Sequence, residues 1–329
     1  MPQPSPAPTV SVIIPAYNVT VWIRDALESV FAQRFTDWEA IVVNDGCPDT
    51  PNLERALAPW RSRIRYLEQR NRGLAGARNA GLHAARGRLI APLDADDVWE
   101  SGYLEAQVAM FEADPSLDVA FTNALIVGDV PEAGLDCMSL APPDNGPITF
   151  ERVVGQECYV IGFAVIRRDT LLAVGGWDES LRSSEDFELW ARILQRGGRF
   201  ARDRRVLAKY RKRAGSLSSD PLWMLESALR AMDRIARYTG LTPAQRAVVE
   251  AQRLRFEAGR HYERARLALR VGDIQGALDG FEAANALQPS RTTAATVTAL
   301  RFAPRLLMAG YRLRRWYLQR RLRARVAAG

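Results

Sequence analysis

Two hydrophobic patterns alternate along the first two thirds of the chain. Short runs rich in β-branched residues, typical of buried strands, are followed by segments with apolar residues on one helical face. The strand-like runs lie at residues 10–16, 38–43, 64–67, 89–93, 119–127, 163–167 and 206–211. The helical segments lie at residues 20–33, 51–60, 75–85, 103–113 and 184–197. This alternation predicts an α/β domain with a mostly parallel sheet and helices on both faces.

The pattern changes near residue 220. Segments 221–238 and 243–287 are long, alanine-rich and helical in their spacing, and they follow a Gly- and Ser-rich stretch at 215–219. The proline-rich start has no basic residue, which excludes a signal peptide. We therefore predict a disordered tail over 1–9, an α/β domain over 10–219, a helical region over 220–290 and a basic helix over 291–329.

Two further segments carry local signals. Residues 128–147 are rich in Pro, Gly and Asp, which predicts a long loop that could act as a lid. In the helical region, residues around a turn at 272–273 resemble one tetratricopeptide repeat. A stable array needs about three repeats, so an ordinary helical hairpin remains the alternative. The matching positions are Tyr262, Ala265, Leu269, Gly272, Asp273, Ala277, Phe281, Ala284, Leu287 and Pro289.

Composition narrows the chemistry. The chain has 329 residues, of which 47% are hydrophobic, enough for a substantial core. Cys47, Cys137 and Cys158 are widely spaced and odd in number, which favours a reducing cytoplasm over a disulfide framework. With only His83 and His261, a metal would be held by carboxylates, which favours Mg²⁺ or Mn²⁺ over zinc. No run reaches the roughly 18 apolar residues of a membrane span.

The positive charge is concentrated at the C-terminus. The net charge is +7, and ten arginines lie between residues 291 and 325, where there is no acidic residue. Segment 298–326 mixes these arginines with aromatic residues and leucines, which predicts a helix that contacts an anionic membrane surface. A solvated helix packed on the domain is the alternative, and nucleic acid is not an expected partner. We expect a cytoplasmic protein that binds peripherally to the inner face of the membrane.

Candidate chemistry lies where predicted strands end. Asp94, Asp96 and Asp97 follow one strand, and carboxylates this close repel one another unless a cation lies between them. Asp45 ends another strand and could accept hydrogen bonds from a nucleobase. Ligands of open α/β sheets bind at the carboxyl ends of the strands. Ordinary polar turns are the alternative interpretation of both patterns.

A basic residue and an acidic pair complete the candidates. Arg78 lies in a Gly-bearing segment at a predicted helix start, where backbone N–H groups and the helix dipole favour a phosphate. Glu185 and Asp186 precede an amphipathic helix, and one carboxylate could act as a general base toward a hydroxyl. Ser183 with Asp186 also fits a helix cap with acids in the first turn.

The order of these motifs resembles that of the family 2 glycosyltransferases, which have the GT-A fold. The resemblance covers about residues 10–213. It rests on VSVIIPAYN (10–18), VNDGCPD (43–49), NRGLAGARNAG (71–81), LDADD (93–97), VGGWDESL (174–181) and SEDFELWARIL (184–194).

The resemblance implies roles for the candidate residues. Asp94 and Asp96 match the DXD pair. Asp96 is implied to bind the metal, Asp94 to contact the ribose and also the metal, and Asp97 to act as a substitute metal ligand. Asp186, with Glu185 beside it, matches the catalytic base. A divalent Mn²⁺ or Mg²⁺ would stabilise the leaving diphosphate. The other positions implied to face the nucleotide are Pro15, Ala16, Tyr17, Asp45 and Arg78.

Three positions depart from the family pattern. Asn44 stands where a second aspartate is usual, Cys47 stands where serine is usual, and Arg213 stands where histidine is common. Asn44 has no charge, which puts the donor specificity in question. The family's QxxRW motif is absent, which argues against a processive polysaccharide synthase.

The resemblance implies an enzyme that transfers a sugar, with inversion, from a nucleoside-diphosphate sugar, and a UDP-sugar is the favoured donor. The acceptor would be a hydroxyl of a glycan or lipid-linked molecule in cell-envelope polysaccharide biosynthesis. A catalytically inactive nucleotide-binding scaffold is the alternative. A nucleotidyltransferase would need a Gly-rich basic loop after the first strand, where the chain instead has PAYNVT (15–20).

Overall fold

The computed structural model describes residues 7–141, 146–213 and 220–305. The chain divides into two compact units. The first comprises Met1–Asp220 and Arg230–Val249, and the second comprises Pro221–Leu229 and Glu250–Gly329. Each unit is described by itself below.

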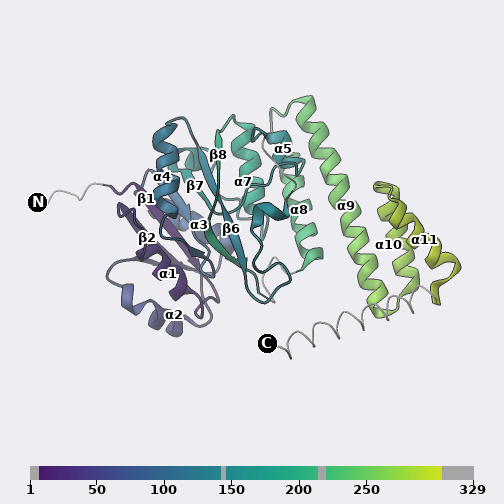
Figure 1. The fold of residues 1–329 in the computed structure, drawn as a ribbon, viewed down its shortest axis with the longest axis horizontal. Coiled ribbons are helices and arrows are strands. Elements are labelled where there is room, and N and C mark those ends of the chain that lie inside the picture. The colour runs from purple at the N-terminus through teal and green to yellow at the C-terminus, as the bar shows by residue number, and fades with distance from the viewer. Residues whose placement is uncertain (1–6, 142–145, 214–219, 306–329) are drawn as a thin grey trace, which may run out of the picture. The chain divides into compact units, whose positions relative to one another are not determined.

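The first unit is built on an eight-stranded sheet with the order β3-β2-β1-β4-β7-β6-β8-β5 (Figure 1). The strands β3, β2, β1 and β4 are parallel neighbours. β7 is antiparallel to β4 and β6, β8 is parallel to β6, and β5 is antiparallel to β8. Only β5 and β7 therefore run against the other strands. The bounds are β1 (Val10–Ala16), β2 (Trp38–Asn44), β3 (Arg65–Glu68), β4 (Leu89–Pro92), β5 (Val98–Trp99), β6 (Val119–Val127), β7 (Ala164–Arg167) and β8 (Phe200–Arg211).

Helices flank this sheet, as the alternation of patterns predicts. One core cluster joins side chains of α1, α2 and α4 to the strands, for example Leu27 and Leu104 with Ile14. α3 packs on the opposite face, where Gly81 lies against Ile13. The elements are α1 (Ile23–Phe31), α2 (Thr50–Leu57), α3 (Gly73–Ala84), α4 (Tyr103–Ala113), α5 (Phe150–Val154), α6 (Arg168–Ala173) and α7 (Glu185–Gln195), with short 3₁₀ helices η1 (Ala58–Trp60) and η2 (Cys137–Leu140).

The predicted α/β class is confirmed, with differences where hydrophobic periodicity is weak. β8 begins six residues before the predicted start at Val206 because its first half has arginines and an aspartate at an exposed edge. α5, α6 and β5 were not predicted, since they span only 5, 6 and 2 residues. Such short elements depend on their tertiary neighbours rather than on local pattern.

The predicted loop at 128–147 contains η2. Asp136 caps η2 by accepting a hydrogen bond from the Ser139 backbone N–H (2.9 Å). Residues 142–145 of this loop lie outside the described part of the chain. A role as a lid stays a prediction.

The C-terminal helices are α8 (Pro221–Ile235), α9 (Pro243–Val271), α10 (Ile274–Leu287) and α11 (Arg291–Phe302). In the second unit, α9 and α10 form a hairpin at the predicted turn, where Gly272 has a positive φ and Asp273 caps α10. Ala265, Leu269 and Phe281 pack in its core. A helical hairpin is therefore present, and its assignment as a tetratricopeptide repeat stays a prediction, as do the predicted domain bounds.

The basic segment 298–326 is described only as far as residue 305. α11 ends at Phe302, and residues 306–329 lie outside the described part of the chain. None of the helices in the described ranges is long and apolar enough to span a membrane.

The close packing of α3 on β1 generates a stability prediction. A Cβ on Gly81 would lie 2.4 Å from Ile13 Cγ2, and Ile13 is fully buried. Gly81→Ala should therefore lower the free energy of unfolding by about 1–3 kcal/mol through overpacking, measured by urea denaturation. His83→Ala, on an exposed position of the same helix, should change it by at most about 0.5 kcal/mol. Equal effects of the two substitutions would contradict the packing argument.

Candidate active site

Asp45 lies directly after β2 and holds the start of α3. Its Oδ1 accepts hydrogen bonds from Gln69 Nε2 (2.7 Å) and the Arg72 backbone N–H (2.8 Å), and its Oδ2 accepts one from the Gly73 backbone N–H (2.9 Å). The carboxylate therefore satisfies N–H groups of the α3 N-terminus, where a negative charge is favourable. Contact with a nucleobase stays a prediction for this residue.

Asn44 organises the turn that positions Asp45. Its Oδ1 accepts from the Cys47 backbone N–H (2.8 Å), and its Nδ2 donates to Thr50 Oγ1 (3.0 Å) and Tyr66 Oη (2.8 Å). The side chain is fully buried. A buried amide with these partners needs no counter-charge, which accounts for an asparagine here.

Pro15, Ala16 and Tyr17 lie at the end of β1, beside this turn. Pro15 and Ala16 pair with Val43 and Asn44 in the sheet, and the Ala16 carbonyl accepts a hydrogen bond from the Asp45 backbone N–H (3.0 Å). Tyr17 is exposed. Of the three residues predicted to face a nucleotide, only Tyr17 therefore presents a large side chain to solvent.

Arg78 on α3 joins three of the predicted site carboxylates. Its Nη2 donates to Asp94 Oδ1 (2.8 Å), and its Nη1 donates to Glu185 Oε1 and Asp186 Oδ1 (2.9 Å each). The guanidinium is almost fully buried. Burial alone would lower the pKa of Arg78, but the three negative charges outweigh burial and raise it. Arg78 is therefore a cation that lies between Asp94, after β4, and the acidic pair Glu185 and Asp186.

The acidic pair begins α7. The N-cap is Ser184 rather than Ser183, with a φ of 63° and no side-chain capping hydrogen bond, whereas Glu185 and Asp186 do lie in the first turn of the helix. Burial raises the pKa of Glu185 to about 7, and the Asp186 charge acts in the same direction. Burial also raises the pKa of Asp186, although the Arg78 charge opposes this.

Trp177 is a site residue to which sequence reasoning gave no role. Its Nε1 donates to Asp186 Oδ1 (3.0 Å), the same oxygen that receives Arg78, and its ring centroid lies 5.7 Å from the Arg78 guanidinium carbon. The only signal was its place in the segment VGGWDESL. Because two donors hold Oδ1, Asp186 has Oδ2 left for other partners.

The three aspartates after β4 are bound by separate groups. Asp94 contacts Arg78, Asp96 Oδ2 accepts from Arg213 Nε (3.1 Å), and Asp97 Oδ1 accepts from the Arg211 backbone N–H (2.8 Å). Burial and the neighbouring aspartate charges raise the pKa of Asp97 well above its usual range, and burial and Asp94 raise that of Asp96. Burial is the larger cause of both shifts, and repulsion between the aspartates adds to it.

The donor set has the chemistry of a hard-cation site. Carboxylate oxygens suit Mg²⁺ and Mn²⁺, and a cation would relieve the repulsion that adds to burial in raising the pKa values of Asp96 and Asp97. Within the described ranges, no group of three or more His, Cys, Asp or Glu side chains is arranged to hold a metal by itself. A metal at Asp94 and Asp96 therefore stays a prediction, and it would need ligands beyond these side chains.

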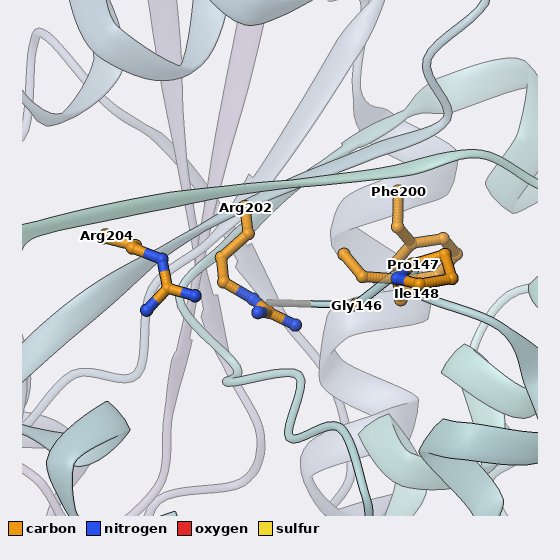
Figure 2. A pocket seen from close by; sticks show the side chains of 6 residues that line it. All are labelled: Gly146, Pro147, Ile148, Phe200, Arg202 and Arg204. Carbon is orange, nitrogen blue, oxygen red and sulfur yellow. The ribbon is translucent and has the colours of Figure 1, made fainter. Parts of the chain in front are cut away.

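A separate pocket of about 320 Å³ lies at the half-buried start of β8 (Figure 2). None of the predicted site residues lines this pocket. Arg202 and Arg204 extend from the same face of β8, and Arg202 Nη2 donates to Cys158 Sγ (2.9 Å). The full lining is Gly146, Pro147, Ile148, Phe200, Arg202 and Arg204.

Two family profiles match the chain: "Glycosyl transferase family 2" over residues 11–172 and "Glycosyltransferase like family 2" over residues 159–242. The chain is 31% identical over 213 residues to the Escherichia coli UDP-Glc:alpha-D-GlcNAc-diphosphoundecaprenol beta-1,3-glucosyltransferase WfgD, covering 64% of this chain and 80% of that protein. It is also 31% identical over 187 residues to an uncharacterized glycosyltransferase of Rickettsia felis, of whose length it spans 30%.

Solved structures share the fold. The crystal structure of S. aureus TarS 1–349 with UDP-GlcNAc has a TM-score of 0.60 and 20% identity, covering 89% of this chain and 87% of that one. The mannosyltransferase PcManGT from Pyrobaculum calidifontis, with GDP-Man and Mn²⁺, has a TM-score of 0.57 and 19% identity, covering 94% and 85%. These likenesses confirm the predicted GT-A fold with additional C-terminal helices.

The raised pKa of Glu185 generates a prediction on the pH dependence of stability. The folded protein keeps a proton up to a pKa of about 7, whereas the ordinary value is 4.5, so the free energy of unfolding should fall as the pH rises across this window. Glu185→Gln should flatten the decline, measured by urea denaturation between about pH 4.5 and 7.5. Glu112→Gln, at an exposed position of α4, should keep the wild-type slope. An unchanged slope in Glu185→Gln would show that other groups cause the decline.

Proposed function

The chain belongs to the family 2 glycosyltransferases, and on this premise we propose that it transfers a sugar, with inversion, from a nucleoside-diphosphate sugar to a hydroxyl of a glycan or lipid-linked acceptor. A UDP-sugar is the favoured donor. WfgD is named for a UDP-sugar donor and a diphosphate-linked lipid acceptor, and TarS was solved with UDP-GlcNAc. Those names support the class of substrate, and the sugar itself is left to experiment.

One observation carries the proposal: Arg78 connects the aspartates after β4 with the acidic pair of α7. Asp94 and Asp186 bind different nitrogens of the same buried guanidinium. A sugar transferase needs a phosphate-binding site and a base within one sugar ring of each other. We infer that the donor diphosphate lies on the Asp94 side of Arg78 and the acceptor hydroxyl on the Asp186 side.

Asp186 is the proposed base. Its Oδ1 is held by Arg78 and Trp177, which fixes the carboxylate plane and leaves Oδ2 to accept a proton. Burial raises the pKa of Asp186, which makes its carboxylate a stronger base than a solvent-exposed one. The acceptor oxygen then bonds to the anomeric carbon as the bond to the diphosphate breaks, and the acceptor proton moves to Oδ2.

Asp96 and Asp94 are the proposed residues for a divalent Mn²⁺ or Mg²⁺, with Asp97 as a substitute ligand. When bound, such a cation stabilises the negative charge of a leaving diphosphate. Arg213 contacts Asp96 and lies with its guanidinium carbon 4.3 Å from the Trp22 ring centroid, so it is a second cation beside the diphosphate site. Asp45, Tyr17, Pro15 and Ala16 stay the proposed nucleotide contacts at the neighbouring strand ends. Peripheral membrane binding through 298–326 also stays a proposal.

The donor experiment tests the function itself. Release of nucleoside diphosphate from UDP-, GDP- and dTDP-sugars would be measured with Mn²⁺ and with EDTA. We expect metal-dependent release from one donor, because hydrolysis by water needs the same diphosphate site as transfer. No release, together with no donor-induced rise in melting temperature, would instead favour an inactive scaffold.

Two substitutions separate the proposed base from the proposed metal ligand. Asp186→Asn should lower kcat by about 10²- to 10⁴-fold with little change in donor affinity, because only proton transfer is removed. Asp96→Ala should weaken metal-dependent donor binding. Both would be measured by steady-state kinetics and by calorimetric donor titration with and without Mn²⁺, with Asp169→Asn at an exposed position of α6 as the control. Full turnover in Asp186→Asn would remove the base assignment.

A further inference from the structure

The segment from Cys158 to Gly162 lies beside the proposed base. Cys158, Val160 and Ile161 are buried, whereas Tyr159 and Gly162 are exposed. Arg202 donates to Cys158 Sγ (2.9 Å) and thereby connects the start of the segment to β8. The segment is therefore anchored by its buried residues and presents two residues outward.

Gly162 keeps one side of Asp186 open. A Cβ built on Gly162 would lie 3.2 Å from Asp186 Oδ2 and would meet no other heavy atom within 4 Å. Its φ lies outside the positive range, so the backbone conformation does not require glycine. Gly162 therefore borders Oδ2 without a side chain that would cover it. This is the oxygen that Arg78 and Trp177 leave without a partner in the network.

Tyr159 lies three residues before Gly162 in the same segment and carries a large aromatic side chain. The side chain is 55% exposed. Partial burial raises the pKa of Tyr159, and the charges of Cys137 and Asp186 act in the same direction. None of the ring–ring contacts between described residues includes it.

We propose that Tyr159 and Gly162 form the subsite for the acceptor sugar: the exposed ring of Tyr159 packs against the C–H face of a pyranose, and Gly162 leaves Asp186 Oδ2 accessible to the attacking hydroxyl. The proposal rests on the proposed role of Asp186 as the base. A pyranose has one apolar face and a polar rim, which matches an aromatic ring beside a carboxylate.

A lipid chain fits this place less well than a sugar. Val160 and Ile161 are buried, so the segment offers one aromatic ring and no continuous apolar surface. The charged group that borders Gly162 is the Asp186 carboxylate, which can hydrogen-bond to hydroxyls.

The test uses full-length protein and ligand-observed saturation-transfer NMR. The probes are methyl glycosides of glucose, galactose, mannose and N-acetylglucosamine, each with saturating UDP. We expect at least one glycoside to bind the wild type, and to bind Tyr159→Ala at least fivefold more weakly. Tyr159→Phe should stay within twofold of the wild type, because it keeps the ring. Phe302→Ala removes an exposed aromatic of α11 and should bind as the wild type does.

Kinetics then separates the two residues. With the donor identified by nucleotide release, Tyr159→Ala should raise the acceptor KM, whereas Gly162→Ala should lower kcat. UDP affinity should be unchanged in both. Absence of glycoside binding to the wild type, equal binding by Tyr159→Ala, or equal loss in Phe302→Ala would overturn the subsite. Loss of UDP binding in the wild type would instead count against the proposed function, so the two failures are distinguishable.

Discussion

Arg78 is a buried cation that contacts three carboxylates, and this charge balance is the constraint on which the site depends. Its partners come from the turn after β4 and from the start of α7. The network therefore joins segments that are far apart in the chain, since 107 positions separate Arg78 from Glu185. Removing one member of a buried ion network leaves an uncompensated charge, which typically costs about 3–5 kcal/mol. The network therefore holds α3, the β4–β5 turn and α7 in one arrangement.

The same network is chemically asymmetric. Three carboxylates face one guanidinium, and Asp96 and Asp97 lie nearby. Burial raises the pKa values of Asp96, Asp97 and Glu185, and repulsion from neighbouring carboxylates adds to this. An excess of buried negative charge favours binding of cations and retention of protons. Under the proposed function, the first property serves the diphosphate side and the second serves the base.

Structural and functional roles coincide at the strand ends. Asp45 satisfies the N-terminus of α3, the helix that carries Arg78, and Asn44 ties the turn that positions Asp45. Trp177 holds the same carboxylate oxygen as Arg78. Each of these contacts fixes the position of a residue in or next to the site. The polar groups that would contact a ligand are therefore largely positioned before the ligand binds.

The sequence by itself determined the α/β class, most strands and helices, and the identity of the carboxylates, because period-2 and period-3.6 patterns and strand-end motifs are local. It did not determine β5, α5 and α6, which are too short to show a pattern, or the first half of β8, whose edge position permits charged residues. Nor could it show that Arg78, expected to face a phosphate, lies between Asp94 and Asp186, or that Trp177 and Gly162 border the same carboxylate. Those relations join residues far apart in the chain, and only tertiary packing and the pairing of buried charges decide them.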